Sequence, residues 1–345
     1  MTAGSLTEKL AHTIERSGPI PVSAYVAAAL YDDAFGFYTA GVGRAGRGGD
    51  FLTSPEVGPL FGAVVARAVD RWWADAGSPP TFVVEEWGAG PGTLARSVVA
   101  ADPACLRAGA LRWVQVEVSP TQRAVHLDHP ALVSVAPLDA ESAPDLVVAN
   151  ELLDNLPFEI AERDADGWKE LRIAAPDRHG RFAAVLGPAV ASPPGADALP
   201  VGSRVPRATD ATRWVGDAID RARSGVIVVD YGAPTCELAR RGDGWLRTHV
   251  AHDDAGDWLV EPGTCDITAD VPFDQLPDGA TITSQADWLR SHGIDALVEA
   301  GRQAWAAGAA RGDLAALRGR SRVREAEALL DPSGLGAFTV LEWGR

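Results

Sequence analysis

The sequence predicts an α/β protein in which helices cover both faces of a mostly parallel sheet. The main observation is a series of short, continuous apolar runs separated by helix-length segments, at residues 81–87, 111–119, 146–149 and 224–232. A second observation is the glycine-rich turn Gly88–Gly92, which directly follows the first of these runs. The last apolar run, residues 334–344, is expected to be a terminal antiparallel strand.

Residues 1–80 are expected to form an N-terminal helical region. Apolar residues recur at helical spacing over residues 5–30, with a break at Ser17–Pro21, and again over Pro55–Ala76. The stretch between these helices, Gly41–Glu56, is rich in glycine and has no periodicity. We therefore predict a long loop between the N-terminal helices and the helix that precedes the sheet.

Residues 81–345 are expected to form the main domain, which two insertions interrupt. The stretch 162–190 alternates polar and apolar residues around a polar turn, as in a β-hairpin, and the first insertion is placed at about 162–215. Residues 285–330 are rich in alanine, leucine and arginine and predict helices. They lie within the second insertion, at about 233–330.

Charge and composition limit the classes of partner. The chain of 345 residues has 31 Lys plus Arg and 47 Asp plus Glu, a net charge of −16, which disfavours a nucleic-acid partner. Its 3 cysteines are far apart, so we expect no metal site. No window approaches the ~18 apolar residues of a membrane span, and the first ten residues have no apolar signal-peptide core. A cytoplasmic protein without membrane insertion is expected.

The glycine turn "EEWGAGPGTL" is compatible with a dinucleotide, a nucleoside or no ligand at all. Glycine lets the backbone approach a ligand and adopt positive φ, which explains Gly88, Gly90 and Gly92. Pro91 removes an N–H that a pyrophosphate would otherwise use, which favours a nucleoside over a dinucleotide. Glu86 precedes the turn and is a further candidate for ligand binding.

Two acidic positions follow the next strands. Glu117 ends the second apolar run, where an acidic residue can accept hydrogen bonds from both ribose hydroxyls, or can instead lie at a helix N-terminus capped by Ser119. The third run ends in Asn150-Glu151, with Asp154 three residues later. These residues suit a cationic substrate or ligand at the edge of the sheet, although Asn150 could instead cap a helix.

These motifs identify a resemblance that runs nearly end to end. The chain resembles the MidA/DUF185 family of class I S-adenosylmethionine-dependent methyltransferases. The motifs that carry the resemblance are "PIPVSAYVAAALYDDAFGFYT" (19–39), "GDFLTSPEVGPLFG" (49–62), "EWGAGPGTL" (86–94), "VEVSP" (116–120), "ANELLDNLP" (149–157), "VDYG" (229–232) and "PGTCDITADVPF" (262–273). The resemblance implies a Rossmann-like sheet of seven strands, the last antiparallel. The chain departs from the family at the turn, where the family usually has Gly-Pro-Gly-Arg-Gly and this chain has Gly88-Ala89-Gly90-Pro91-Gly92. It also has Leu152 and Leu153 after Asn150-Glu151, where the family commonly has two aromatic residues.

The resemblance also implies roles for individual residues. We expect S-adenosyl-L-methionine as cofactor, with Glu86, Gly88, Gly90 and Gly92 at its methionine and ribose side, Glu117 on the ribose and Asp139 near the adenine. A lid over the cofactor is expected to contain Asp50, Thr53, Ser54 and Glu56, and Ser54 and Pro55 would also fit the N-cap and first position of the next helix. Asn150, Glu151 and Asp154 are expected on the acceptor side, with Asn150 also touching the cofactor.

The family's mitochondrial members are complex I assembly factors that methylate protein arginine. The resemblance therefore implies a protein substrate, with a respiratory-complex subunit as a candidate and with the acceptor nitrogen on a guanidinium group. A non-catalytic assembly factor that keeps the fold and a small-molecule methyltransferase are the alternatives. A nicotinamide oxidoreductase is disfavoured by Pro91. A homodimer stays open, because the helices after residue 285 could pack on a second subunit.

Overall fold

A seven-stranded sheet forms the centre of the protein, whose computed structural model describes residues 5–40, 53–140, 143–250, 253–254, 256–310 and 313–344. The strand order is β16-β17-β10-β5-β2-β3-β4. The strands are β2 (Phe82–Trp87), β3 (Leu111–Val116), β4 (Leu132–Val135), β5 (Leu146–Asn150), β10 (Gly225–Asp230), β16 (Thr281–Ser284) and β17 (Thr339–Gly344). Neighbours from β4 to β10 pair in parallel, whereas β17 is antiparallel to β10. The predicted fold class and its antiparallel last strand are confirmed.

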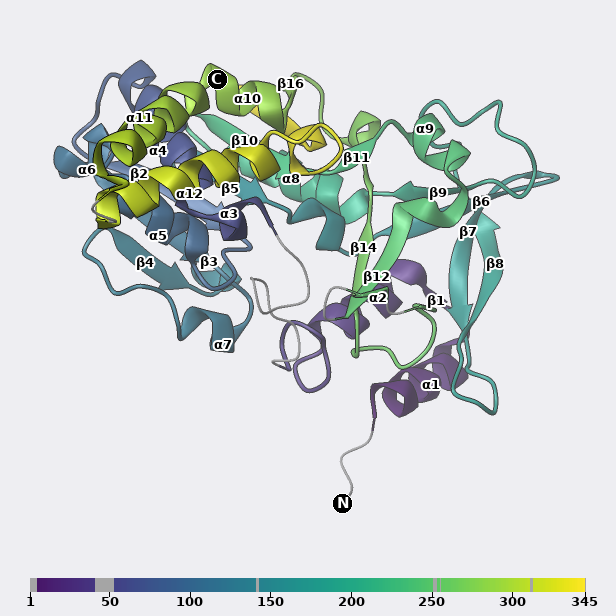
Figure 1. Ribbon diagram of the computed structural model, residues 1–345. Helices are drawn as coiled ribbons and strands as arrows, with labels where there is room; N and C mark the ends of the chain where they lie inside the picture. The colour runs from purple at the N-terminus through teal and green to yellow at the C-terminus, as the bar shows by residue number, and fades with distance from the viewer. Residues whose placement is uncertain are drawn as a thin grey trace.

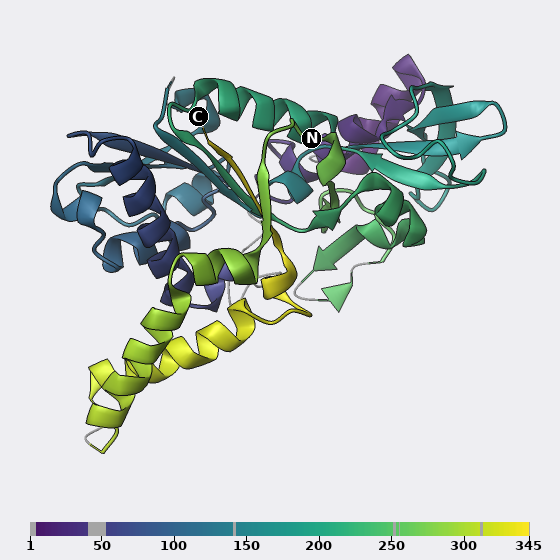
Figure 2. The same ribbon diagram turned by 90° about the horizontal axis from the view of Figure 1, so that it is seen from above.

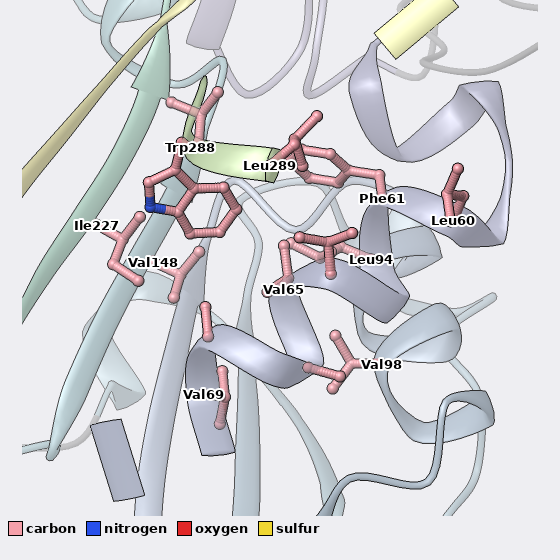
Figure 3. Close-up of a cluster of buried hydrophobic side chains, with 14 of the residues drawn as sticks. Leu60, Phe61, Val65, Val69, Leu94, Val98, Val148, Ile227, Trp288 and Leu289 are labelled. Atoms are coloured by element: carbon pink, nitrogen blue, oxygen red, sulfur yellow. The ribbon is translucent and has the colours of Figure 1, made fainter. Parts of the chain in front are cut away.

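Helices bury both faces of this sheet, which explains why its strands are continuously apolar. On one face lie α4 (Pro59–Asp75), α5 (Thr93–Ala100) and α10 (Gln285–Ser291), and on the other lies α8 (Thr209–Arg221). Val148 and Ile227 pack in the cluster of α4 and α10 (Figure 3), while Val147 and Val226 pack in the cluster of α8. Alternate residues of one strand thus fill two cores.

The strand register brings the carboxyl ends of four strands to one edge. Trp87 at the end of β2 lies opposite Val116 of β3 and Ala149 of β5. Asn150 at the end of β5 lies opposite Val229 of β10. The segments that follow these strands therefore meet at the same edge, where open α/β sheets bind their ligands.

A second core lies beside the main sheet (Figure 1). It contains a five-stranded antiparallel sheet of β1 (Ile20–Pro21), β6 (Glu159–Asp164), β7 (Gly167–Ala174), β8 (Ala183–Ala189) and β9 (Arg204–Arg207), together with β12 (Leu246–Val250), β13 (Asp253–Asp254) and β14 (Asp266–Ala269). The hairpin predicted from sequence is β7 and β8. Helices α1 (Leu6–Ser17) and α2 (Val22–Tyr31) pack in this core. The helices within residues 1–80 thus divide between two cores, since α4 packs on the main sheet.

Helices α11 (Ile294–Gly308) and α12 (Leu314–Leu329) form a hairpin that projects from the body of the protein (Figure 2). The two helices cross closely at Gly319, where an added Cβ would lie 2.4 Å from the carbonyl oxygen of Gly301. Glu325 anchors the base of the hairpin, because its buried carboxylate accepts a hydrogen bond from Leu60 N at 2.8 Å and fills the space beside Gly58. The remaining short elements are α3 (Ser54–Val57), α6 (Ala104–Arg107), α7 (Pro120–Arg123), α9 (Thr235–Arg240), β11 (Gly232–Ala233) and β15 (Val271–Pro272).

Candidate active site

The glycine turn after β2 uses its own amides internally. Gly88 and Ala89 both donate their N–H to the carbonyl oxygen of Val116, at 3.0 and 3.2 Å, and Gly92 donates to Ala89 at 2.9 Å. Gly90 donates to the Glu117 carboxylate at 2.8 Å. Pro91 has no N–H, so no amide from Gly88 to Gly92 is left for a phosphate. The turn is therefore built for a ligand other than a pyrophosphate.

Gly88, Gly90 and Gly92 have φ values of 69°, 51° and 74°, a region that costs an L-residue roughly 1–2 kcal/mol. An alanine Cβ at Gly90 would meet nothing within 4 Å, but at Gly92 it would lie 2.4 Å from Oε1 of the buried Gln115. Crowding of this kind costs a further ~1–3 kcal/mol. In urea unfolding, the free energy of unfolding should therefore fall by about 2–5 kcal/mol in Gly92→Ala and by about 1–2 kcal/mol in Gly90→Ala. Equal losses would contradict the crowding at Gly92.

Glu117 follows β3 and joins the glycine turn to the next loop. Its two carboxylate oxygens accept hydrogen bonds from Gly90 N at 2.8 Å and from Ser119 N at 2.7 Å. Burial raises the pKa of this carboxyl, while the two backbone donors and Arg123 oppose that shift. Each carboxylate oxygen has a second lone pair, so Glu117 can still accept hydrogen bonds from ribose hydroxyls in the cavity that it lines.

Glu86 is the second-last residue of β2, two positions before the first glycine of the turn. Trp113 Nε1 donates a hydrogen bond of 2.6 Å to its carboxylate. Burial raises the pKa of Glu86 to about 8, against the effect of that hydrogen bond. Glu86 also lines the cavity, so it can meet a cationic group of a bound ligand.

A cavity of about 230 Å³ lies at this edge of the sheet. It joins the glycine turn and Glu117 to the end of β5, and the N-terminal segment closes another side with Tyr31, Tyr38 and Thr53. Among the described residues that line it, every Asp, Glu, Lys or Arg is a glutamate: Glu56, Glu86, Glu117 and Glu151. Carboxyl groups can ionise against a bound cation but only repel a phosphate, so this lining favours a cation over a phosphate.

Asn150 is the last residue of β5, Glu151 follows it, and both line this cavity. Glu151 has φ 52°, which is rare for a residue with a side chain. Its Oε1 accepts hydrogen bonds from Ser54 N at 3.2 Å and from Asn150 Nδ2 at 3.0 Å. Burial first, and then the negative charge of Asp154, raise the pKa of Glu151 to about 8. The buried Oδ1 of Asn150 has no hydrogen-bond partner among the described residues and is free to accept one from a ligand.

The loop that follows Glu151 is held by Asp230, the last residue of β10, and by Tyr231, which follows it. Leu153 N donates to the Asp230 carboxylate at 2.8 Å, and the Tyr231 hydroxyl donates to Asp154. Asp154 belongs to this loop, but its side chain is buried away from the cavity and is not among the groups that line it. Burial raises its pKa to about 6. The structure therefore brings Asn150 and Glu151 to the cavity and sets Asp154 behind them.

The predicted lid residues take different positions. Thr53 and Glu56 line the cavity, whereas Ser54 is fully buried and donates its hydroxyl to Gln285 at 2.9 Å. The N-cap of α3 is Thr53 rather than Ser54, which corrects that expectation. Asp50 lies outside the described residues. Asp139 is exposed and does not line the cavity, although Pro137 of the same short turn does.

Sequence reasoning missed an aromatic wall. Trp87 and Trp214 both line the cavity and meet edge to face, with ring centroids 5.8 Å apart. Trp87 is fixed from behind, since its Nε1 donates to Glu85 at 2.9 Å and Arg221 lies over its ring. Trp214 comes from α8, more than a hundred residues along the chain, so only the folded structure places it here.

Comparison with known proteins decides the family. A family model described as an S-adenosyl-L-methionine-dependent methyltransferase matches residues 64–293. The chain belongs to the MidA/DUF185 methyltransferase family. A relative of this methyltransferase, "Protein arginine methyltransferase NDUFAF7 homolog, mitochondrial" from Drosophila melanogaster, is 30% identical over 78% of this chain and 68% of its own length. The protein arginine methyltransferase NDUFAF7 of Xenopus tropicalis is 28% identical over 85% of this chain and 76% of its own.

A solved structure supports the same assignment for this MidA/DUF185 methyltransferase. A Burkholderia thailandensis protein crystallised with S-adenosylhomocysteine superposes with a TM-score of 0.82 at 28% identity, covering 99% of this chain and 92% of that one. The cofactor of the methyltransferase is S-adenosyl-L-methionine. The cavity fits it, because its glutamates suit the sulfonium and ammonium charges and the orphan Oδ1 of Asn150 offers an acceptor.

The comparisons correct the expected location of the MidA/DUF185 methyltransferase. The relatives from fly, frog, mouse and human are all named as mitochondrial, which contradicts a cytoplasmic protein. The expectation failed because the absence of an apolar signal-peptide core does not bear on mitochondrial targeting segments, which are amphipathic. Within the described part of the chain, no helix is both long and apolar enough to cross a bilayer.

Proposed function

We propose that this chain is a protein arginine methyltransferase whose acceptor guanidinium binds against Asn150 and Glu151. The single observation that carries the proposal is Glu151, whose carboxyl lines the cavity beside the glycine turn in a strained backbone conformation and has a pKa raised by burial to about 8. A guanidinium is always charged, so it needs a carboxylate to bind it and to orient one nitrogen. The relatives named protein arginine methyltransferases support this acceptor class.

The bound cofactor supplies a methyl group on a positively charged sulfur, which is already an excellent leaving group. The chain's own task is mainly to align the nucleophile, which can contribute several kcal/mol. Asn150 Oδ1 can accept a hydrogen bond from one guanidinium N–H, and Glu151 can accept from another. Transfer of a methyl group to the protonated guanidinium adds a second positive charge, which is removed when the methylated nitrogen releases a proton. The Glu151 carboxylate is placed to take that proton.

The residues that contact the cofactor are assigned from their places in or beside the cavity lining. We assign the ribose hydroxyls to Glu117 and the methionine end to Glu86 and the turn at Gly88, Gly90 and Gly92, with Thr53 and Glu56 covering the cofactor. Asp154 supports the acceptor site through the loop rather than by direct contact. A subunit of a respiratory complex is the candidate acceptor, and the projecting α11–α12 hairpin is a candidate surface for a homodimer.

The test is methyl-labelling of a native lysate by the purified protein, followed by mass spectrometry of the labelled residue. We expect label on arginine of one or a few proteins, and on the order of 100-fold less label with Glu151→Gln. Label on small molecules alone would favour a small-molecule methyltransferase. S-adenosylhomocysteine binding without any labelling would favour the non-catalytic assembly factor.

A further inference from the structure

Two of the chain's 4 tyrosines line the cavity, and the roles assigned so far use neither. Tyr31 is the last residue of α2. The chain then turns back along the helix, with Phe37 N donating to Ala29 at 2.9 Å and Tyr38 N donating to Leu30 at 3.0 Å. The turn places the rings of Tyr31 and Tyr38 side by side, 22° from parallel with centroids 5.8 Å apart. They form a second aromatic wall of the cavity.

The tyrosine wall is fixed to the loop that carries Glu151. The Tyr31 hydroxyl donates to the carbonyl oxygen of Asn155 at 3.0 Å, and Asn155 Nδ2 donates to Asp266 at 3.1 Å. Asn155 itself lines the cavity with Glu151. The wall and the reactive loop are therefore parts of one hydrogen-bonded unit, although they come from positions more than a hundred residues apart.

The surroundings of the wall are strongly acidic. Burial, and then the charges of Asp266 and Asp154, raise the pKa of the Tyr31 hydroxyl far above its usual value. Burial and the charge of Asp266 do the same for Tyr38. Both rings thus stay neutral phenols, which keep an electron-rich face. Burial raises the pKa of Asp266 to about 7, so this acid can gain negative charge when a cation enters.

We propose that Tyr31 and Tyr38 form the recognition wall of the acceptor subsite. The subsite takes a flat cation, the guanidinium of arginine, with the two tyrosine rings on one side of it and Glu151 on the other. Cations bind the faces of aromatic rings, and a planar guanidinium also stacks on them. A lysine ammonium is a compact, strongly hydrated charge and gains less from such a wall. The inference deepens the proposed function, on which it rests, by naming what selects the acceptor.

The test uses the protein saturated with S-adenosylhomocysteine and three small probes: L-argininamide, L-lysinamide and L-citrullinamide. Tyrosine labelled with carbon-13 gives ring signals for only 4 residues, and single Tyr→Phe variants assign them. We expect argininamide to shift the signals of Tyr31 and Tyr38. Neutral citrullinamide should bind at least 10-fold more weakly, and lysinamide should bind more weakly than argininamide.

Leucine and phenylalanine variants separate the ring from the hydroxyl. Tyr38→Leu should weaken argininamide binding about 10-fold, whereas Tyr38→Phe keeps a ring and should change it less than 3-fold. Tyr25→Phe is the matched control, because Tyr25 lies on α2 with Tyr31 and, like Tyr31, donates to a backbone carbonyl at 3.0 Å, but does not line the cavity. It should leave both argininamide and S-adenosylhomocysteine affinity unchanged.

Two results would overturn the inference. One is argininamide that fails to bind, or binds without shifting either ring signal, which is measurable even if the leucine variants do not fold. The other is arginine labelling in the lysate that proceeds with an unchanged KM in Tyr31→Leu and Tyr38→Leu, in which case the proposed function stands without the tyrosine wall. If the unmodified protein fails to bind S-adenosylhomocysteine, the proposed function itself is refuted.

Discussion

Glu117→Ala should raise the dissociation constant for S-adenosylmethionine at least about 100-fold in isothermal titration. Each hydrogen bond to a charged group contributes roughly 1.5–3 kcal/mol, and two ribose hydroxyls lose their acceptor. The same change leaves the N–H groups of Gly90 and Ser119 without their partner, so the glycine turn itself loosens. About 1.4 kcal/mol corresponds to a tenfold change in affinity, so two lost bonds suffice.

Asp139→Ala is the matched control for Glu117, because it also removes an acid, but one that is exposed and lies outside the cavity lining, two residues from Pro137. It should change the affinity by less than threefold. Glu117→Gln is not a mild substitution here, since both carboxylate oxygens face backbone donors and an amide NH₂ would oppose one of them. Tight binding of S-adenosylmethionine by Glu117→Ala would remove Glu117 from the ribose site.

Glu151→Gln should lower methyl transfer on the order of 100-fold or more while leaving the affinity for S-adenosylhomocysteine nearly unchanged. Both hydrogen bonds to Glu151 end on Oε1, so a glutamine oxygen can accept the same two donors and hold the loop in place. What is lost is the negative charge that binds the guanidinium and the group that takes up its proton, a step typically worth 10²–10⁴-fold. Transfer rates measured with radiolabelled cofactor check this outcome.

Asp154→Asn serves as the control for Glu151, since Asp154 lies behind the loop and an amide oxygen can still accept from Tyr231. It should retain most of the activity. The pH profile adds a second check: with a pKa of about 8, Glu151 is mostly protonated at neutral pH, so kcat/KM should rise with pH up to about 8. The rise should vanish from the residual activity of Glu151→Gln.

The same pKa values have a consequence for stability. Glu86 and Glu151 have a pKa of about 8 in the folded protein against a usual value of 4.5, so the folded state holds more protons than the unfolded state between these limits. The free energy of unfolding therefore falls as pH rises through this window. Glu151→Gln removes one of the carboxyls whose pKa is raised, so its free energy of unfolding should fall less steeply between about pH 5 and pH 8.

The positions of four central strands could be predicted from the sequence because β2, β3, β5 and β10 are buried on both faces and therefore read as continuous apolar runs. Two strands escaped notice. β4 (Leu132–Val135) and β16 (Thr281–Ser284) lie at the two edges of the sheet, are less buried and have polar residues among their four positions. Short edge strands carry too weak a pattern to be recognised alone.

Site residues divide in the same way. Parallel register alone brings to one edge the residues that lie at or just after the strand ends: Gly88, Gly90, Glu117, Asn150 and Glu151. Whether a residue near such an edge faces the cavity depends on local turns, which the sequence did not resolve: Asp154 and Ser54 point into the protein.

Trp214, Tyr31 and Tyr38 reach the cavity only through tertiary packing. They come from α8, from the last residue of α2 and from the turn after α2, which no strand-end rule connects to the glycine turn.

The base of the α11–α12 hairpin constrains how this chain can vary or be re-engineered. The Glu325 carboxylate fills the space that a Cβ at position 58 would take, and Gln285 joins the hydroxyl of Ser54 to the end of α12 through Leu329. Ser54 in turn holds Glu151. A hairpin exchanged for that of a relative would therefore have to bring its own partner for positions 54 and 58, and trimming the hairpin for crystallisation or fusion would disturb the reactive edge through three short contacts.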